Sequence, residues 1–109
     1  MSEVQTIDWK GKSGNSYRYW IHRIGTAFRD SPGNYIYAKE VQPGRWSPLY
    51  IGQTKRLETR LASHEKEQEA RRSGATHIHA HSSGAEAERT AEELDLCRAW
   101  KPSCNEMLV

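Results

Sequence analysis

The chain has 109 residues, of which 36% are hydrophobic and 28% are charged. This balance is typical of one folded domain and argues against a disordered chain. No apolar run is long enough to span a membrane, and the first residues lack the apolar segment of a signal peptide. The two cysteines, Cys97 and Cys104, have neither zinc-site spacing nor the density of a secreted disulfide scaffold, so we expect two reduced thiols in a cytoplasmic protein.

Charge is distributed unevenly along the sequence. Residues 1–72 carry a net charge of +5 and residues 73–109 carry −3, which together give the overall +2. A basic body followed by an acidic segment is compatible with binding to nucleic acid, but an ordinary solvated surface has the same imbalance. Charge alone leaves both possibilities open.

The first third of the chain predicts one strand. Residues 1–15 are mostly polar, and we expect them to be loosely ordered. Residues 16–22 mix aromatic and polar side chains in the manner of a strand, which would add to the edge of a sheet. A turn signal, Asp-Ser-Pro-Gly, follows at residues 30–33.

The next segment predicts a hairpin. A strand is expected over residues 34–38, where Tyr35 and Tyr37 share one face because alternate residues of a strand point the same way. A further strand is expected over residues 48–51. The short connection favours antiparallel pairing, and its residues 43–46 are interpreted as an extended loop.

The second half predicts two helices separated by a strand. A basic helix is expected over residues 55–70, where Arg60 and His64 lie four residues apart and should share a face. Residues 76–81 alternate with the period of a strand. The last helix is expected to end near Trp100, since a proline follows two residues later.

These elements predict a single α/β (α+β) domain over residues 1–109. Its sheet is expected to be small, mainly antiparallel and three- to four-stranded, with helices flanking it. The core is expected to cover about residues 33–105.

Several short motifs, in this order, resemble the signature of the GIY-YIG nuclease family. They are Gly33-Asn34-Tyr35, Tyr50-Ile51-Gly52, Arg60, His64, Glu93 and Asn105. Each motif is weak alone, but their common order and spacing are specific. The resemblance covers roughly residues 33–105, about two-thirds of the chain.

The resemblance implies metal-dependent hydrolysis of a nucleic-acid phosphodiester, with DNA as the expected substrate and Mg²⁺ or Mn²⁺ as a single ion. Glu93 is expected to bind that ion, and Arg60 to stabilise charge on the phosphoryl oxygens with its planar fork. Tyr35 or Tyr50 is expected to help deprotonate the attacking water. His64 would either shuttle a proton or hydrogen-bond the phosphate, and the sequence does not decide between these roles.

Four further residues are predicted to contact the nucleic acid: Gln53, Lys55, Arg56 and His79. A separate protein partner could supply specificity to so small a domain. Gln53 also stands where some family members carry a lysine, and Asn34 replaces an aliphatic residue. These departures favour an alternative, a nucleic-acid-binding module that kept the fold and lost the reaction.

Ordinary structural roles compete with the site assignment. Arg60 could merely pair with Glu58 or Glu65 on the helix surface, where such a pair contributes little. Glu93 lies among other acidic residues, so a solvated acidic face is the simplest alternative. Only the order of the motifs argues for one shared site.

A second cluster consists of His77, His79 and His81. On a strand these three side chains share one face, about 7 Å apart. That spacing is too wide for neighbouring imidazoles to bind one ion comfortably, so a polar face or a nucleic-acid contact is favoured over a transition-metal site.

Overall fold

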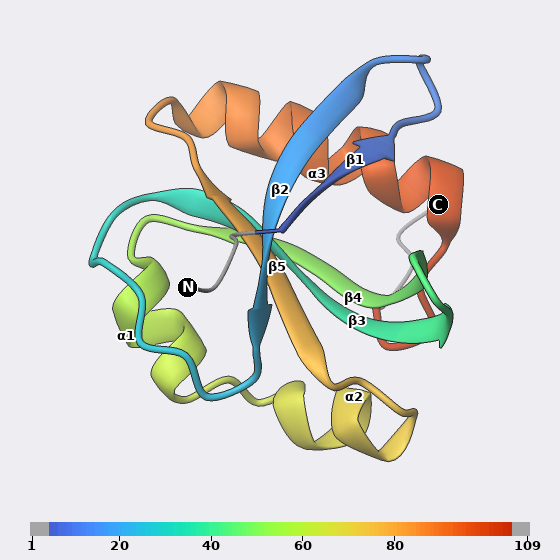
Figure 1. Cartoon of the computed structure of the whole chain (residues 1–109). Coiled ribbons are helices and arrows are strands. Elements are labelled where there is room, and N and C mark those ends of the chain that lie inside the picture. The colour runs from blue at the N-terminus through green and yellow to red at the C-terminus, as the bar shows by residue number, and fades with distance from the viewer. Residues whose placement is uncertain (1–4, 106–109) are drawn as a thin grey trace.

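The computed structural model describes residues 5–105, in which a five-stranded sheet is flanked by helices (Figure 1). The elements in chain order are β1 (Thr6–Lys10), β2 (Ser16–Arg23), β3 (Gly33–Gln42), β4 (Arg45–Thr54), α1 (Leu57–Ala62), α2 (Glu67–Arg72), β5 (His77–Ser82) and α3 (Glu86–Trp100). The strand order is β1-β2-β5-β3-β4, and every neighbouring pair is antiparallel. The predicted fold class is confirmed, with one strand more than expected.

Strand β3 lies inside the sheet and supplies both of its cores. Tyr35 and Tyr37 point to one face, where they pack with Leu61 of α1. Ile36 points to the other face and packs with Leu96 of α3. Because residues alternate along a strand, this one segment separates a face covered by α1 and α2 from a face covered by α3. Figure 1 shows the helices divided in this way.

The expectation that residues 1–15 are loosely ordered is corrected for residues 6–10. These residues form β1, which pairs along its whole length with β2. Trp9 is almost fully buried and packs with Tyr19 in the α3-facing core. Strand β1 therefore occupies the sheet edge, and β2 lies between β1 and β5.

The hairpin formed by β3 and β4 is confirmed, but its extra residues are not a loop. Both strands continue to a tight turn at Pro43 and Gly44, where Gly44 has φ of +77°. The register shifts between Tyr37 and Ala38 and again near the tip, which marks β-bulges. The extra length therefore extends and bends the ribbon.

The single helix predicted over residues 55–70 is broken into α1 and α2. Ser63 leaves helical geometry with φ of −152°, and the imidazole of His64 turns inward to a buried position. The premise that Arg60 and His64 share one helix face is therefore wrong, because His64 lies beyond the end of α1.

No helix among residues 5–105 is both long and apolar enough to cross a membrane.

Candidate functional site

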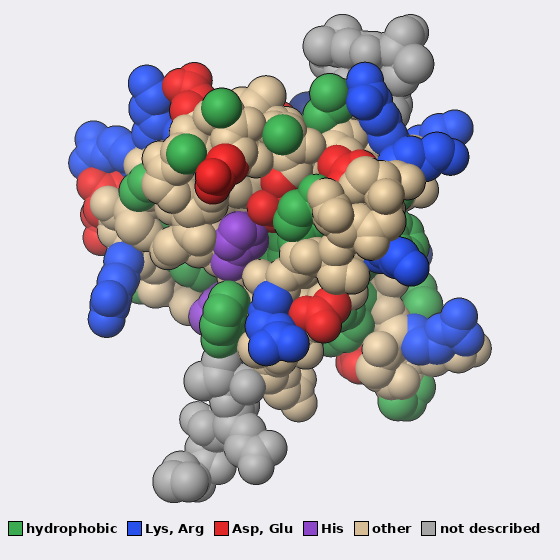
Figure 2. Space-filling view, turned by 90° about the horizontal axis from the view of Figure 1, so that it is seen from above, with side chains coloured by type: hydrophobic (Ala, Val, Ile, Leu, Met, Phe, Trp, Pro, Cys, Tyr) green, Lys and Arg blue, Asp and Glu red, His purple; other side chains and the backbone are tan. Residues whose placement is uncertain are grey.

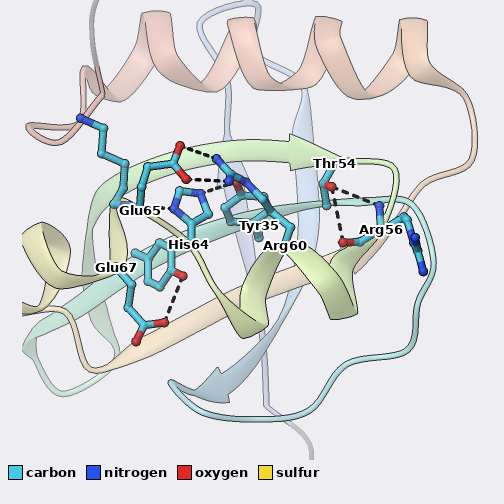
Figure 3. Close-up of polar contacts among 9 residues, drawn as sticks. Tyr35, Thr54, Arg56, Arg60, His64, Glu65 and Glu67 are labelled. Atoms are coloured by element: carbon cyan, nitrogen blue, oxygen red, sulfur yellow. Dashed lines mark hydrogen bonds and ion pairs between the residues drawn. The ribbon is translucent and has the colours of Figure 1, made fainter.

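Four of the predicted residues gather on the face of the sheet that α1 covers, and Figure 3 shows three of them, Tyr35, Arg60 and His64. Tyr35 comes from β3 and Tyr50 from β4, and their rings stack with centroids 6.2 Å apart at 25°. The ring of His64 lies edge-on to Tyr50 at 5.0 Å. The Tyr35 hydroxyl is 2.7 Å from His64 Nε2, and the Arg60 guanidinium lies beside the same hydroxyl. A phenol, an imidazole and a guanidinium thus converge although they come from separate elements.

The direction of the Tyr35–His64 hydrogen bond follows from the second ring nitrogen. The backbone N–H of Lys66 donates to His64 Nδ1 at 2.9 Å, so Nδ1 carries no proton. Burial, aided by the charge of Arg60, lowers the pKa of His64 to about 4, so the ring is neutral at pH 7. The remaining proton must be on Nε2, which therefore donates to the Tyr35 hydroxyl oxygen.

This arrangement prepares the Tyr35 hydroxyl for a third partner. Its oxygen accepts a hydrogen bond from His64, so its own proton is available to another acceptor. Burial raises the pKa of Tyr35, and the neighbouring Arg60 offsets only part of that rise. Tyr35 is therefore a neutral phenol at pH 7, and further positive charge nearby is needed before it acts as a base.

Arg60 is held by Glu65 in a bidentate ion pair. Nη1 and Nη2 lie 2.6 Å and 2.8 Å from the two carboxylate oxygens. The guanidinium lowers the pKa of the Glu65 carboxyl to about 2. The same planar fork fits a phosphate, and an exposed pair of this kind is weak enough to exchange. The predicted pairing of Arg60 with Glu65 is thus present, although Glu65 lies between α1 and α2, and it occupies the donors that a phosphate would use.

Gly52 makes room for the tip of the Tyr35 ring. A Cβ atom at this position would lie 2.6 Å from both Cζ and Oη of Tyr35 and 3.0 Å from Cε2 of Tyr50. Real Cβ atoms do not approach other atoms so closely. Glycine is therefore required for the close approach of the two tyrosines, and not for an unusual backbone angle.

Glu93 belongs to α3, on the opposite side of the sheet from α1. Its carboxylate is half-buried, and burial raises its pKa. Burial raises the pKa of Tyr50, the charge of Arg60 offsets part of that rise, and the charge of Glu93 adds to it. Within residues 5–105 this carboxylate has no hydrogen bond or ion pair that would satisfy it.

The chemistry of Glu93 fits a hard divalent cation. A half-buried carboxylate with no partner among the described residues gains stability when positive charge approaches it. In residues 5–105, no three His, Cys, Asp or Glu side chains group closely enough to hold an ion by themselves. Mg²⁺ commonly binds through one or two carboxylates and keeps waters and phosphate oxygens as its other ligands. Glu93 is suited to such a site.

Comparison with solved structures identifies the architecture. The chain is similar to the magnesium-bound GIY-YIG N-terminal endonuclease domain of UvrC from Thermotoga maritima, with TM-score 0.58 and 27% identity over 72% of this chain and 86% of that one. A point mutant of the same domain, bound to the catalytic divalent cation, gives TM-score 0.59 and 25% identity over 72% and 87% of the two chains. The chain has the GIY-YIG fold. No model of a known protein family matches the sequence, and neither does any curated protein.

Asn105, the last residue of the GIY-YIG signature, secures the strand that carries Tyr50. Its side-chain oxygen accepts from the Ile51 N–H and its amide donates to the Ile51 carbonyl, each at 2.8 Å. Both main-chain polar groups of Ile51, on the open edge of β4, are thereby paired instead of facing solvent. Asn105 therefore positions the second motif.

Two departures from the GIY-YIG pattern are explained by Arg89, which sequence reasoning missed. Arg89 is 2% exposed, and its guanidinium donates to the Gln53 side chain and to the carbonyls of Ser83 and Gly84. Asn34, also buried, donates to the Arg89 carbonyl. A mid-helix arginine gives no local signal of burial, so only the fold reveals this cluster.

The four predicted substrate contacts are placed differently. Gln53 turns toward α3 and binds Arg89, on the face away from the tyrosines. Lys55 and Arg56 are exposed and line a groove of about 340 Å³ that also includes Arg60. Arg56 pairs with Asp30 at 2.6 Å. Lys55 and Arg56 therefore remain candidates for a nucleic-acid contact, whereas Gln53 has a structural partner.

The histidines of β5 share one face, as predicted, but each has a separate environment. His79 is fully buried, and its Nδ1 accepts from Trp9 Nε1 at 3.0 Å. His77 lies edge-on to Trp46 at 4.9 Å, and His81 Nε2 is 2.6 Å from a Glu92 carboxylate oxygen. His79 offers no exposed atom to a nucleic acid, and the three rings do not converge on a common point.

Proposed function

We propose that the chain is a divalent-metal-dependent endonuclease or nickase that hydrolyses phosphodiester bonds of nucleic acid, with DNA as the substrate. The observation that carries the proposal is the Tyr35 hydroxyl, which accepts a hydrogen bond from a neutral His64 beside the Arg60 guanidinium. A buried phenol whose oxygen receives hydrogen bonds from neighbouring donors is suited to orienting a nucleophile and, once deprotonated, to accepting the proton of that nucleophile. The GIY-YIG fold of the metal-bound UvrC domain supports the same reaction class.

Arg60 would bind the scissile phosphate by exchanging Glu65 for two phosphoryl oxygens. The bidentate geometry of the present ion pair has the form that this contact requires. Since negative charge grows on these oxygens during the reaction, a fixed guanidinium stabilises the transition state more than the bound substrate.

To act as the base, Tyr35 would first lose its hydroxyl proton to solvent, and its phenolate oxygen would then accept a proton from the attacking water and become a neutral phenol again. The negative charge of that phenolate would be stabilised by His64 Nε2–H and by Arg60, which already lie beside the oxygen. A divalent ion held by Glu93 would supply the positive charge that lowers the pKa of a nearby hydroxyl or water. His64 acts in this scheme as a donor that positions Tyr35, because its Nδ1 is occupied by the Lys66 N–H.

Surface charge is consistent with local rather than broad contact to the nucleic acid. On the face seen in Figure 2, Lys and Arg side chains lie around the rim and are interspersed with acidic ones, without one continuous basic patch. Binding through a few phosphates predicts a modest salt dependence. A partner protein that supplies affinity and specificity fits this surface.

The two free thiols, Cys97 and Cys104, fit a reducing compartment such as the cytoplasm.

The proposal is tested by nicking of supercoiled plasmid and by cleavage of single-stranded, duplex, branched and RNA oligonucleotides with Mg²⁺, Mn²⁺ or EDTA. Glu93→Gln and Arg60→Ala should each remove cleavage, whereas Glu88→Gln, an exposed control on the same helix, should retain it. Salt-sensitive binding without cleavage under every condition would replace the nuclease with a nucleic-acid-binding module. Full activity in Glu93→Gln would refute the metal assignment.

A further inference from the structure

A second concave surface lies on the α1-covered side of the sheet, separate from the tyrosine cluster. It is a groove of about 660 Å³ between β2, the end of β5, the 24–32 segment and the start of α1. Its lining includes Trp20, His22, Phe28, Arg29, Leu57 and Ala80. The volume lies within the range of small-ligand sites and is sufficient for a nucleotide.

The groove has an aromatic floor and an aromatic wall. Trp20 is 41% exposed, although it lies on β2, which has a neighbouring strand on each side. Its register partner on β5 is the small residue Ala80, which leaves the indole uncovered on that side. Phe28 packs edge-on against His22 at 5.0 Å and forms the wall. A flat aromatic surface beside a second ring is the geometry on which nucleobases stack.

The groove is connected to the candidate site through the sheet and through α1. Trp20 pairs with Ala80, and Ala80 pairs with Tyr35, so Trp20 and Tyr35 lie in one row on the same face. Two strand spacings, about 10 Å, separate their backbones. Leu57 lines the groove and begins the helix that carries Arg60 one turn later. A nucleic-acid strand bound at Arg60 therefore reaches the groove within a few nucleotides.

The charge of the groove suits a phosphate beside the stacked base. Arg29 is exposed at its margin, and the described residues that line the groove include no Asp or Glu. The nearby acid Asp30 is neutralised by its ion pair with Arg56. Among residues 5–105 the Arg29 guanidinium has no ion-pair partner, and such a guanidinium beside an exposed indole is a combination typical of single-strand binding.

We infer that this groove binds an unpaired nucleotide of the substrate strand, with the base stacked on Trp20 and a neighbouring phosphate contacted by Arg29. The inference rests on the proposed function and adds the class of substrate to it. A base inside a regular duplex cannot reach the indole, so the groove selects single-stranded, branched or locally unpaired nucleic acid.

The test measures, by fluorescence anisotropy and without divalent ions, the binding of a short oligothymidylate and of a duplex of equal length. Trp20→Ala should weaken single-strand binding about tenfold, Trp20→Phe should restore most of it, and both should leave duplex binding unchanged. Arg29→Ala should reduce the slope of log binding constant against log salt concentration by about one, the value for one lost phosphate contact. Trp100→Ala is the matched control, because Trp100 is also 41% exposed but lies at the end of α3.

The outcomes separate this inference from the nuclease proposal. Absence of oligothymidylate binding, no loss in Trp20→Ala, or an equal loss for duplex would overturn the groove assignment even if the chain cleaves DNA. Trp20-dependent binding would support the groove even if every metal fails to produce cleavage. Melting curves of each variant identify any loss that comes from unfolding.

Discussion

Gly52→Ala is the substitution that most directly tests the packing of the site. The added Cβ would lie 2.6 Å from Oη of Tyr35, whereas ordinary contact begins at 3.4 Å, so the phenol must move by the difference of 0.8 Å. That displacement exceeds the whole range of good N–H···O distances, about 2.7–3.2 Å, and so disrupts the bond from His64. The backbone at Gly52 is accessible to alanine, so steric overlap is the sole cause.

Two magnitudes follow from this displacement. Overpacking of a close-packed interior costs about 1–3 kcal/mol, which lowers the melting temperature of a domain of this size by roughly 5–20 °C. Misplacing a reacting group by about 1 Å reduces the rate about 100-fold. The nicking rate should therefore fall about 100-fold at a temperature where the variant is still folded, while DNA binding stays near the wild-type value.

The assay combines thermal unfolding with single-turnover nicking. Gly84→Ala is the matched control, because a Cβ there meets nothing within 4 Å and the backbone is not left-handed. If Gly52→Ala melts and nicks like Gly84→Ala, the close approach of the two tyrosines is not what this glycine provides, and the geometric account of the site fails.

Four further outcomes are expected. Glu93→Gln should abolish Mn²⁺ binding in calorimetry. The melting temperature should stay equal or rise, because burial disfavours the charged carboxylate, and a lower melting temperature would contradict that account of Glu93. Glu65→Gln should lower the KM for DNA about two- to fivefold, because it releases Arg60 to bind phosphate, whereas the control Glu69→Gln should leave the KM unchanged. An unaltered KM in Glu65→Gln would show that Glu65 does not compete with phosphate for Arg60. Burial lowers the pKa of His79 to about 3, so its imidazole is protonated first in the unfolded chain as pH falls below about 6.5. His79 should therefore account for up to about 3 kcal/mol of the stability lost between pH 6.5 and 4, in addition to the loss from His64, and His79→Gln should reduce the slope of stability against pH in urea titrations. Arg89→Met should destabilise the fold by at least about 2 kcal/mol in the same titrations, because three acceptors lose their donor, whereas Arg98→Met should be neutral.

The sequence predicted the elements that local patterns specify. The hairpin around Tyr35 and Tyr50, the β5 strand and the last helix all follow from short-range alternation, turn residues and a terminating proline. Strand β1 was missed because its one deeply buried side chain, Trp9, is held by His79, 70 residues away. A polar strand stabilised by such distant contacts has no local signal.

The break between α1 and α2 was missed for a related reason. Helical spacing continues through residues 63–66, and the charged residues there are good helix formers. The helix ends because His64 is buried against Tyr35, and its Nδ1 takes the Lys66 N–H that a continued helix would use. A tertiary contact thus overrides helix propensity at the position where the chemistry needs an inward imidazole.

Asn34 and Gln53, which depart from the family motif, have structural partners that the sequence does not reveal. Read from the family pattern, they weaken the case for catalysis, because each replaces a residue of a signature motif. Both side chains instead face α3 and bind Arg89, away from the phenol hydroxyls. Arg89 lies one helical turn before Glu93, so these contacts fix the helix that presents the carboxylate. The substitutions therefore bear on how α3 is held against the sheet, and the groups that would act on the phosphate are unaffected.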